Sequence, residues 1–68
     1  MIDYAPLWHT LLDKGMKKTD LMEKVPISSV TLAKLGNNKS VSLDIIERIC
    51  TTLSCRIEDV VEIRTGKE

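Results

Sequence analysis

Residues 15–39 read GMKKTDLMEKVPISSVTLAKLGNNK, and this stretch decides the fold. Pro26 divides it into two helical segments, because the residue before a proline is driven out of helical geometry. Ser28 is a good N-cap for the second segment, and the Gly-Asn-Asn run at 36–38 can end it, since these residue types tolerate left-handed backbone. The apolar residues are spaced to face one core: Leu21, Val25, Ile27, Leu32 and Leu35. The sequence therefore predicts two short helices joined by a tight turn.

Apolar segments flank this pair on both sides. Before it, Pro6 suits the first turn of a helix, which Lys14 and Gly15 can close. The stripe of that helix consists of Leu7, Trp8, Leu11 and Leu12. After the pair, Ser42 can cap the most apolar helix of the chain. Within the pair, Thr19 can cap the first helix. The core side of the later helix comprises Leu43, Ile45, Ile46, Ile49, Cys50 and Leu53.

The two ends of the chain have a less decided pattern. Residues 1–4, MIDY, fit either a brief strand or a loose end. Residues 56–64, RIEDVVEIR, fit a short helix or a strand, and one helical turn followed by a strand satisfies both patterns. We expect an all-α fold: one compact five-helix domain over residues 1–68, with which a short strand pairing at the termini is compatible.

Size and composition favour a small non-enzymatic domain. A chain of 68 residues with 43% hydrophobic residues builds one small core, which leaves little free energy for a buried catalytic cavity. The single histidine, His9, has no partner acid or nucleophile, and the glycines stand too far apart for a phosphate-binding loop. We therefore expect no catalytic residues, no cofactor, no metal ion and no small-molecule ligand.

The two cysteines lack the spacing of a zinc site. Cys50 and Cys55 lie in ICTTLSC, and no second cysteine or histidine pair completes a ligand set. We expect reduced cysteines buried as small apolar side chains, the alternatives being a redox-sensing thiol or a crosslink. No apolar run approaches the roughly 20 residues of a membrane span, and Asp3 interrupts any signal peptide. These features predict a cytoplasmic protein without a membrane partner.

The charges are divided between the two halves of the chain, although the net charge is zero. Residues 14–39 carry six lysines, opposed by Asp20 and Glu23. Residues 44–62 carry five acidic residues, opposed by Arg48 and Arg56. A basic half that coincides with the helix pair can dock on phosphates, and the alternative is an ordinary solvated surface.

Three quoted segments carry a resemblance to a known family. They are GMKKTDL, which opens the pair, ISSVTLAKLGNN over its second helix, and VSLDIIERICTTLSC followed by IEDVVEI. In these segments the chain resembles the Cro/C1-type (XRE, phage-repressor-like) helix-turn-helix family, especially its small stand-alone VanU-like bacterial members. The resemblance covers nearly the whole chain. It implies a lambda-repressor-like fold and a transcriptional regulator that binds double-stranded DNA, with the helix Ser28–Leu35 in the major groove.

The resemblance also implies which residues contact DNA. Those matching base-contacting positions are Ser29, Val30, Thr31 and Lys34. Those matching positions near phosphates are Lys17, Lys18, Ser28, Asn37, Asn38 and Lys39. The chemistry agrees, since hydroxyls read bases loosely, Val30 can contact a thymine methyl, and Lys34 can reach guanine O6 and N7. The alternative for Val30 and Thr31 is that they face the protein.

Two further alternatives stay open at this point. One recognition helix reads only a few base pairs, so we expect a homodimer on a palindrome, formed through the apolar segment Val60–Ile63. Equally, that segment can close the core of a monomer. The zero net charge and the absence of Arg, Gln or Asn in the body of the second helix support another function, a protein-interaction module of adaptor or antitoxin-like type.

Overall fold

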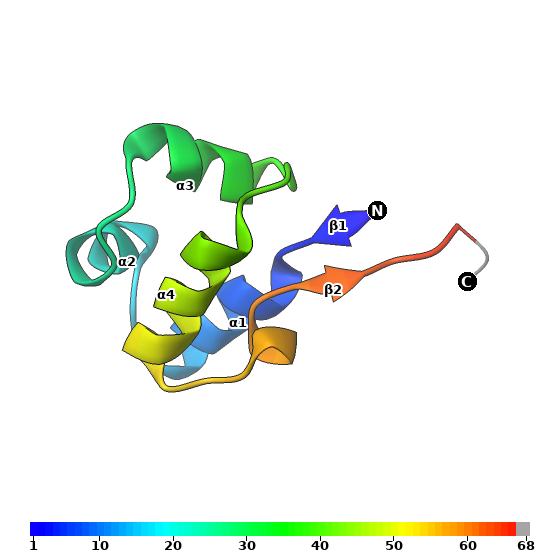
Figure 1. Ribbon diagram of the computed structural model, residues 1–68. Helices are drawn as coiled ribbons and strands as arrows, with labels where there is room; N and C mark the ends of the chain where they lie inside the picture. The colour runs from blue at the N-terminus through cyan, green and yellow to red at the C-terminus, as the bar shows by residue number, and fades with distance from the viewer. Residues whose placement is uncertain (67–68) are drawn as a thin grey trace.

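The computed structural model describes residues 1–66 and consists of helices around one core, with the two ends of the chain paired (Figure 1). The elements in order are β1 (Ile2–Asp3), α1 (Ala5–Asp13), α2 (Lys18–Lys24), α3 (Ser29–Gly36), α4 (Leu43–Leu53), the 3-10 turn η1 (Ile57–Asp59) and β2 (Glu62–Ile63). The predicted domain extends to residue 68, and residues 67 and 68 lie outside the described part. Within residues 1–66, no helix is both long enough and apolar enough to cross a membrane.

The prediction of five helices is wrong, because residues 1–66 form four α-helices and the predicted fifth is a single turn. The carboxylate of Asp59 accepts a hydrogen bond from the backbone N–H of Arg56 at 3.1 Å, which favours one turn over Ile57–Asp59. Val60 then inserts into the core with no exposed surface, and the chain leaves in extended form. The mixed pattern, one helical turn followed by a strand, is therefore confirmed.

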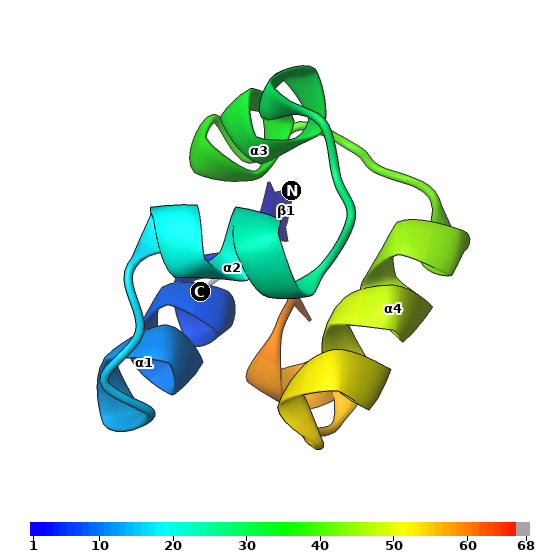
Figure 2. The same ribbon diagram turned by 90° about the vertical axis from the view of Figure 1, so that its left-hand side faces the viewer.

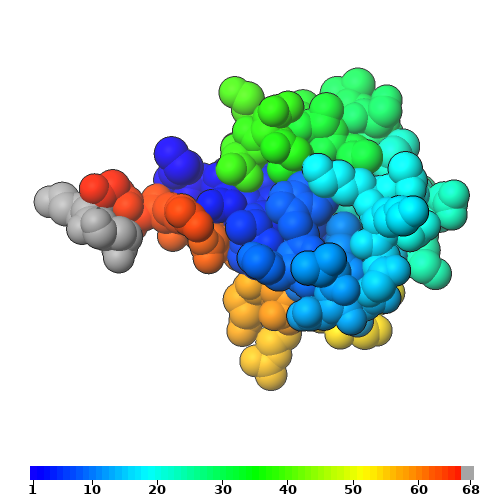
Figure 3. All heavy atoms as spheres, turned by 180° about the vertical axis from the view of Figure 1, so that it is seen from behind, coloured from blue at the N-terminus to red at the C-terminus, as the bar shows by residue number. Residues whose placement is uncertain are grey.

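The predicted pairing of the termini is also confirmed. β1 and β2 are antiparallel, with Ile2 opposite Ile63 and Asp3 opposite Glu62. The two facing carboxylates would repel each other, but the guanidinium Nε of Arg64 lies 2.7 Å from Asp3 Oδ2 and 2.9 Å from Glu62 Oε2. Figure 3 shows the paired ends standing out from the helical body.

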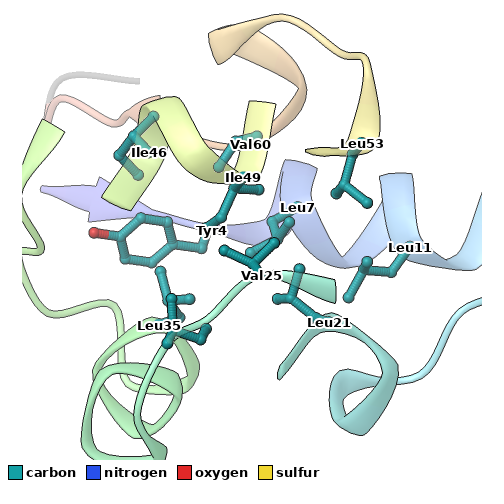
Figure 4. Packing of buried hydrophobic residues seen from close by; sticks show 11 residues of the cluster. Tyr4, Leu7, Leu11, Leu21, Val25, Leu35, Ile46, Ile49, Leu53 and Val60 are labelled. Atoms are coloured by element: carbon teal, nitrogen blue, oxygen red, sulfur yellow. The ribbon is translucent and has the colours of Figure 1, made fainter. Parts of the chain in front are cut away.

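The core contains side chains from every helix of the described chain (Figure 4). Its buried members are Tyr4, Leu7, Leu11, Leu21, Val25, Ile27, Leu35, Ile46, Ile49, Leu53 and Val60. The prediction that the helix pair faces one core is confirmed, with Leu32 partly buried. Two residues of the predicted stripes lie outside the core, since Leu12 is 76% and Leu43 75% exposed. Leu12 follows Leu11 by one residue and so lies about 100° round the helix, while Leu43 opens α4 at the end reached from an exposed loop.

Local signals fix where the helices begin. The hydroxyl of Ser28 accepts from the N–H of Thr31 at 3.1 Å, and that of Ser42 from Ile45 at 3.3 Å, so both predicted N-caps are confirmed. The prediction that Thr19 caps α2 is wrong, because the helix already begins at Lys18 and Thr19 lies in its first turn. The N-terminus of α2 is stabilised instead by the carboxylate of Asp20, which accepts a hydrogen bond from the backbone N–H of Lys17 at 2.8 Å.

Three ionisable groups are stabilised in their neutral form by burial. Desolvation raises the pKa of the Tyr4 phenol, and it is also the main reason that the pKa values of the Cys50 and Cys55 thiols are raised. The folded state therefore holds these protons more tightly than the unfolded chain does.

We expect the free energy of unfolding to fall as the pH rises above about 8.5, where thiols of the unfolded chain begin to lose their protons. Urea unfolding followed at intervals from pH 7 to pH 11 measures this dependence. The double variant Cys50→Ser/Cys55→Ser is the control, because it removes the part of the decline that the thiols cause. A stability that rises over this interval would contradict the burial of these groups.

Candidate nucleic-acid interface

The helix α3 lies on the outside of the molecule, with α2 between it and α1 (Figure 2). Val25, the residue before Pro26, is extended (φ −111°, ψ 119°), which ends α2 and turns the chain. Ile27 is 9% exposed and anchors the turn in the core, so that α3 starts in a fixed direction after its N-cap Ser28. On its inner side α3 buries Leu35 completely.

The outer face of α3 carries three of the four predicted base-contacting residues. Ser29, Val30 and Lys34 are exposed, Val30 at 64%, so the alternative that Val30 faces the protein is wrong. Thr31 is only partly exposed, and its hydroxyl accepts a hydrogen bond from that of Ser28 at 3.1 Å. Thr31 therefore belongs partly to the N-terminal cap of the helix. Ala33 is exposed as well, one turn after Ser29, and so extends the same face.

Two lysines lie at the start of α2, the first helix of the pair. Lys17 and Lys18 are both exposed. The Lys18 ammonium lies 4.6 Å from the centroid of the Trp8 ring, a cation–π distance. Trp8 was predicted to be a core residue, and it is partly buried against the core while one side of its ring faces Lys18.

The loop after α3 holds the remaining candidates for phosphate contacts. Lys39 has an exposed side chain, but its backbone N–H donates to the carbonyl of Lys34 at 2.8 Å, which keeps it close to the end of α3. The side chains of the two asparagines already make hydrogen bonds within the protein. Asn37 Nδ2 donates to the carbonyl of Ala33 at 2.9 Å, and Asn38 Oδ1 accepts from the N–H of Tyr4 at 3.0 Å.

The outer helix α3, with its serine N-cap, follows the short helix α2 after a tight turn. The comparison with protein-family models agrees with this arrangement. The family model described as Cro/C1-type HTH DNA-binding domain matches residues 6–66. The chain belongs to the Cro/C1-type helix-turn-helix family.

Two relatives extend this finding. The chain is 33% identical over 60 residues to an uncharacterized HTH-type transcriptional regulator, YozG, of Bacillus subtilis (strain 168), with 85% of this chain and 71% of that protein aligned. Its fold is similar to the crystal structure of the transcriptional regulator VanUg, with a TM-score of 0.87 and 44% sequence identity over 90% of this chain and 81% of that one. A Cro/C1-type domain and relatives named as transcriptional regulators together support a DNA-binding regulator.

Two features of α3 and the loop after it were not singled out in the sequence analysis. Ala33 has no hydrogen-bonding group that would single it out, although its place one turn after Ser29 is a sufficient signal. The second feature is the contact between Tyr4 and the loop after α3. No local pattern reveals this contact, because the residues concerned are 34 and 35 positions apart.

The other candidate sites of the chain lie away from α3. Cys50 and Cys55 are free thiols, partly rather than fully buried, on α4 and in the segment after it. Among residues 1–66, no group of three or more His, Cys, Asp or Glu side chains could hold a metal ion. His9 is exposed on α1.

Proposed function

We propose that this chain is a bacterial, cytoplasmic, non-enzymatic regulator of transcription, and that residues 1–68 form one domain that inserts α3 into the DNA major groove. The observation that carries the proposal is the outer face of α3, where Ser29, Val30 and Lys34 are exposed while Leu35 on the opposite side is fully buried. An α-helix fits the width of the major groove, and these side chains would meet base edges there.

The chemistry of this face indicates how it would read DNA. Lys34 supplies donors for guanine O6 and N7, Val30 a methyl surface for thymine, and Ser29 a hydroxyl that accepts or donates. Thr31 would contribute from the edge of the face, because it is only partly exposed. Since none of these side chains makes a planar bidentate contact, we expect moderate specificity, with DNA shape contributing.

The proposed phosphate contacts come before and after α3 along the chain. Lys17 is the N-cap residue of α2, Lys18 is the first residue of that helix, and Lys39 follows α3. Phosphate contacts of this kind position a domain and do not read sequence. We further propose that Asn37 and Asn38 contact phosphates through amide protons that their present hydrogen bonds leave available. Ser28 would do so through its backbone N–H, because its hydroxyl proton is donated to Thr31.

We also propose a homodimer that joins two copies of α3 on one palindromic site. Within the segment Val60–Ile63, Val60 is fully buried and belongs to the core of a single copy, whereas Ile63 is 69% exposed. Met1 lies at the same paired ends and is 81% exposed. Ile63 and Met1 are therefore the apolar side chains that this segment and its partner strand would offer to a second copy.

Selection of bound duplexes from a random DNA pool tests the proposal. We expect enrichment of a short motif that occurs twice in inverted orientation, with half-sites about one helical turn apart. A single unrepeated motif would argue for binding by a monomer. A pool that shows no enrichment after repeated rounds at low salt would contradict the proposed function.

The contact between Lys18 and Trp8 supplies a second, independent prediction. If Lys18 moves to a phosphate, it leaves the face of the ring, so the fluorescence of Trp8, the one tryptophan in the sequence, should change on DNA binding. In Lys18→Gln that change should be much smaller, and binding should lose about one unit of salt slope. Lys24→Gln, exposed on the same helix, is the matched control. Binding without a fluorescence change in the unmodified chain would count against a contact by Lys18.

A second candidate function, docking of a protein partner in the manner of an adaptor or antitoxin, is favoured by a different surface. Leu43 and Ile57 are 75% and 49% exposed and line a hollow of about 440 Å³ between α4 and η1. The carboxylate-bearing residues Asp44 and Glu47 also line it. If the DNA selection fails, this surface is the first to test with protein partners.

A further inference from the structure

Tyr4 is the one buried side chain of the core that carries a hydroxyl group, among the residues described. Its side chain is 1% exposed, and its hydroxyl donates to the backbone carbonyl of Lys39 at 2.8 Å. Its own backbone N–H donates to Asn38 Oδ1 at 3.0 Å. In Figure 4 the phenol oxygen points away from the surrounding apolar side chains. Tyr4 thus makes two hydrogen bonds to one short loop far along the chain.

That loop is the C-terminal cap of α3. Asn38 has a left-handed backbone (φ 56°), and the N–H of Lys39 donates to the carbonyl of Lys34 at 2.8 Å, the long hydrogen bond of a Schellman motif. The shorter bond of the motif runs from the N–H of Asn38 to the carbonyl of Leu35 at 3.4 Å. Tyr4 therefore joins the start of α1, where it is the N-cap residue, to the end of α3.

The identities of Tyr4 and Asn38 indicate that their contact does more than fill space in the core, because both residues supply hydrogen-bonding groups. Glycine is the commonest residue at the left-handed position of such a cap, because it has no Cβ to clash. Asparagine costs more there, but unlike glycine it offers Oδ1 to the N–H of Tyr4. An apolar side chain in place of Tyr4 would fill the same space but would leave the carbonyl of Lys39 without this donor.

We propose that Tyr4 is a positioning residue for DNA binding. It holds the C-terminal cap of α3 in place, as a clamp, and so fixes the direction in which the Lys39 side chain extends into solvent. This inference rests on the proposed function, in which Lys39 contacts a phosphate. Tyr4 itself is buried and does not touch the DNA. Its effect on binding passes through Asn38 and Lys39, the two residues of the loop after α3 to which it is hydrogen-bonded.

The clamp can be tested without DNA by amide hydrogen exchange measured with NMR. In Tyr4→Phe and in Asn38→Gly, which keeps the left-handed backbone but removes Oδ1, we expect exchange of the Lys39 amide to become roughly tenfold faster. Ile49→Val is the control, because it alters the core without removing either hydrogen bond between Tyr4 and the loop. Unchanged exchange at Lys39 in both variants would overturn the clamp.

A double-mutant cycle on the selected duplex tests the positioning role. We expect Tyr4→Phe to weaken binding about three- to tenfold in the unmodified chain and less than about twofold when Lys39 is already replaced by Gln. A merely destabilising Tyr4→Phe would reduce binding equally in both backgrounds, and that result, or a Lys39→Gln variant that binds normally, would overturn the proposal. If the unmodified chain binds no DNA, the proposed function fails, while faster exchange at Lys39 still establishes the clamp.

Discussion

Replacing Ser29, Val30 and Lys34 together by alanine is expected to abolish sequence-specific DNA binding and to leave the fold intact. Each proposed base contact contributes about 1–3 kcal/mol of discrimination, so that the affinity for the selected duplex should fall at least about 100-fold. All three side chains are exposed, and surface changes of this kind alter stability by only about 0.5 kcal/mol each. Fluorescence anisotropy with the labelled duplex and thermal unfolding measure the two effects separately.

A matched set of substitutions on α4 provides the control for this variant. Leu43, Arg48 and Thr51 are exposed and repeat the chemistry of the three α3 residues, with one apolar, one cationic and one hydroxyl side chain. Their combined replacement by alanine should leave DNA affinity within about twofold of the unmodified chain. If the α3 variant binds as well as this control, then α3 is not the recognition helix.

Leu35→Ala is expected to remove a large part of the protein's stability. Leu35 lies in the last turn of α3 and is fully buried. Replacing a buried leucine by alanine destabilises a domain by about 2–5 kcal/mol. A domain of this size has a total stability of roughly 3–10 kcal/mol, so a loss of this magnitude removes much of it. Circular dichroism during urea unfolding measures the change in the unfolding free energy.

Leu12→Ala is the control for the core, because it removes the same atoms from a side chain that is 76% exposed. We expect it to change the unfolding free energy by less than about 1 kcal/mol. Equal effects of the two leucine substitutions would mean that Leu35 does not lie in the core and that α3 is not anchored as described.

The helix pair could be predicted from the sequence because its signals are local. Pro26 ends α2 through the geometry of the residue before it, and Ser28 caps α3 with a hydroxyl three residues from its partner. The count of helices could not be predicted in the same way. The segment Ile57–Asp59 stops after one turn because Val60 is drawn into a core contributed by distant parts of the chain.

The candidate site also has one part that the sequence could predict and one part that it could not. The exposure of Ser29, Val30 and Lys34 follows from helical periodicity once the inward side of α3 is known. The engagement of Asn38 with Tyr4 does not, since it joins residues 34 positions apart and involves a backbone donor that no sequence pattern marks. The resemblance assigns Asn38 to a phosphate contact, and in the structure its side-chain oxygen already accepts a hydrogen bond from the N–H of Tyr4.

The dependence of DNA affinity on salt concentration tests the central claim most directly. If Lys17, Lys18 and Lys39 each neutralise a phosphate, the logarithm of the binding constant should fall with the logarithm of the salt concentration with a slope of about −2.7 for one copy of the chain. A dimer on a palindrome should give about −5. Binding to the selected duplex that does not change between low and physiological salt would contradict an interface built from these lysines and α3.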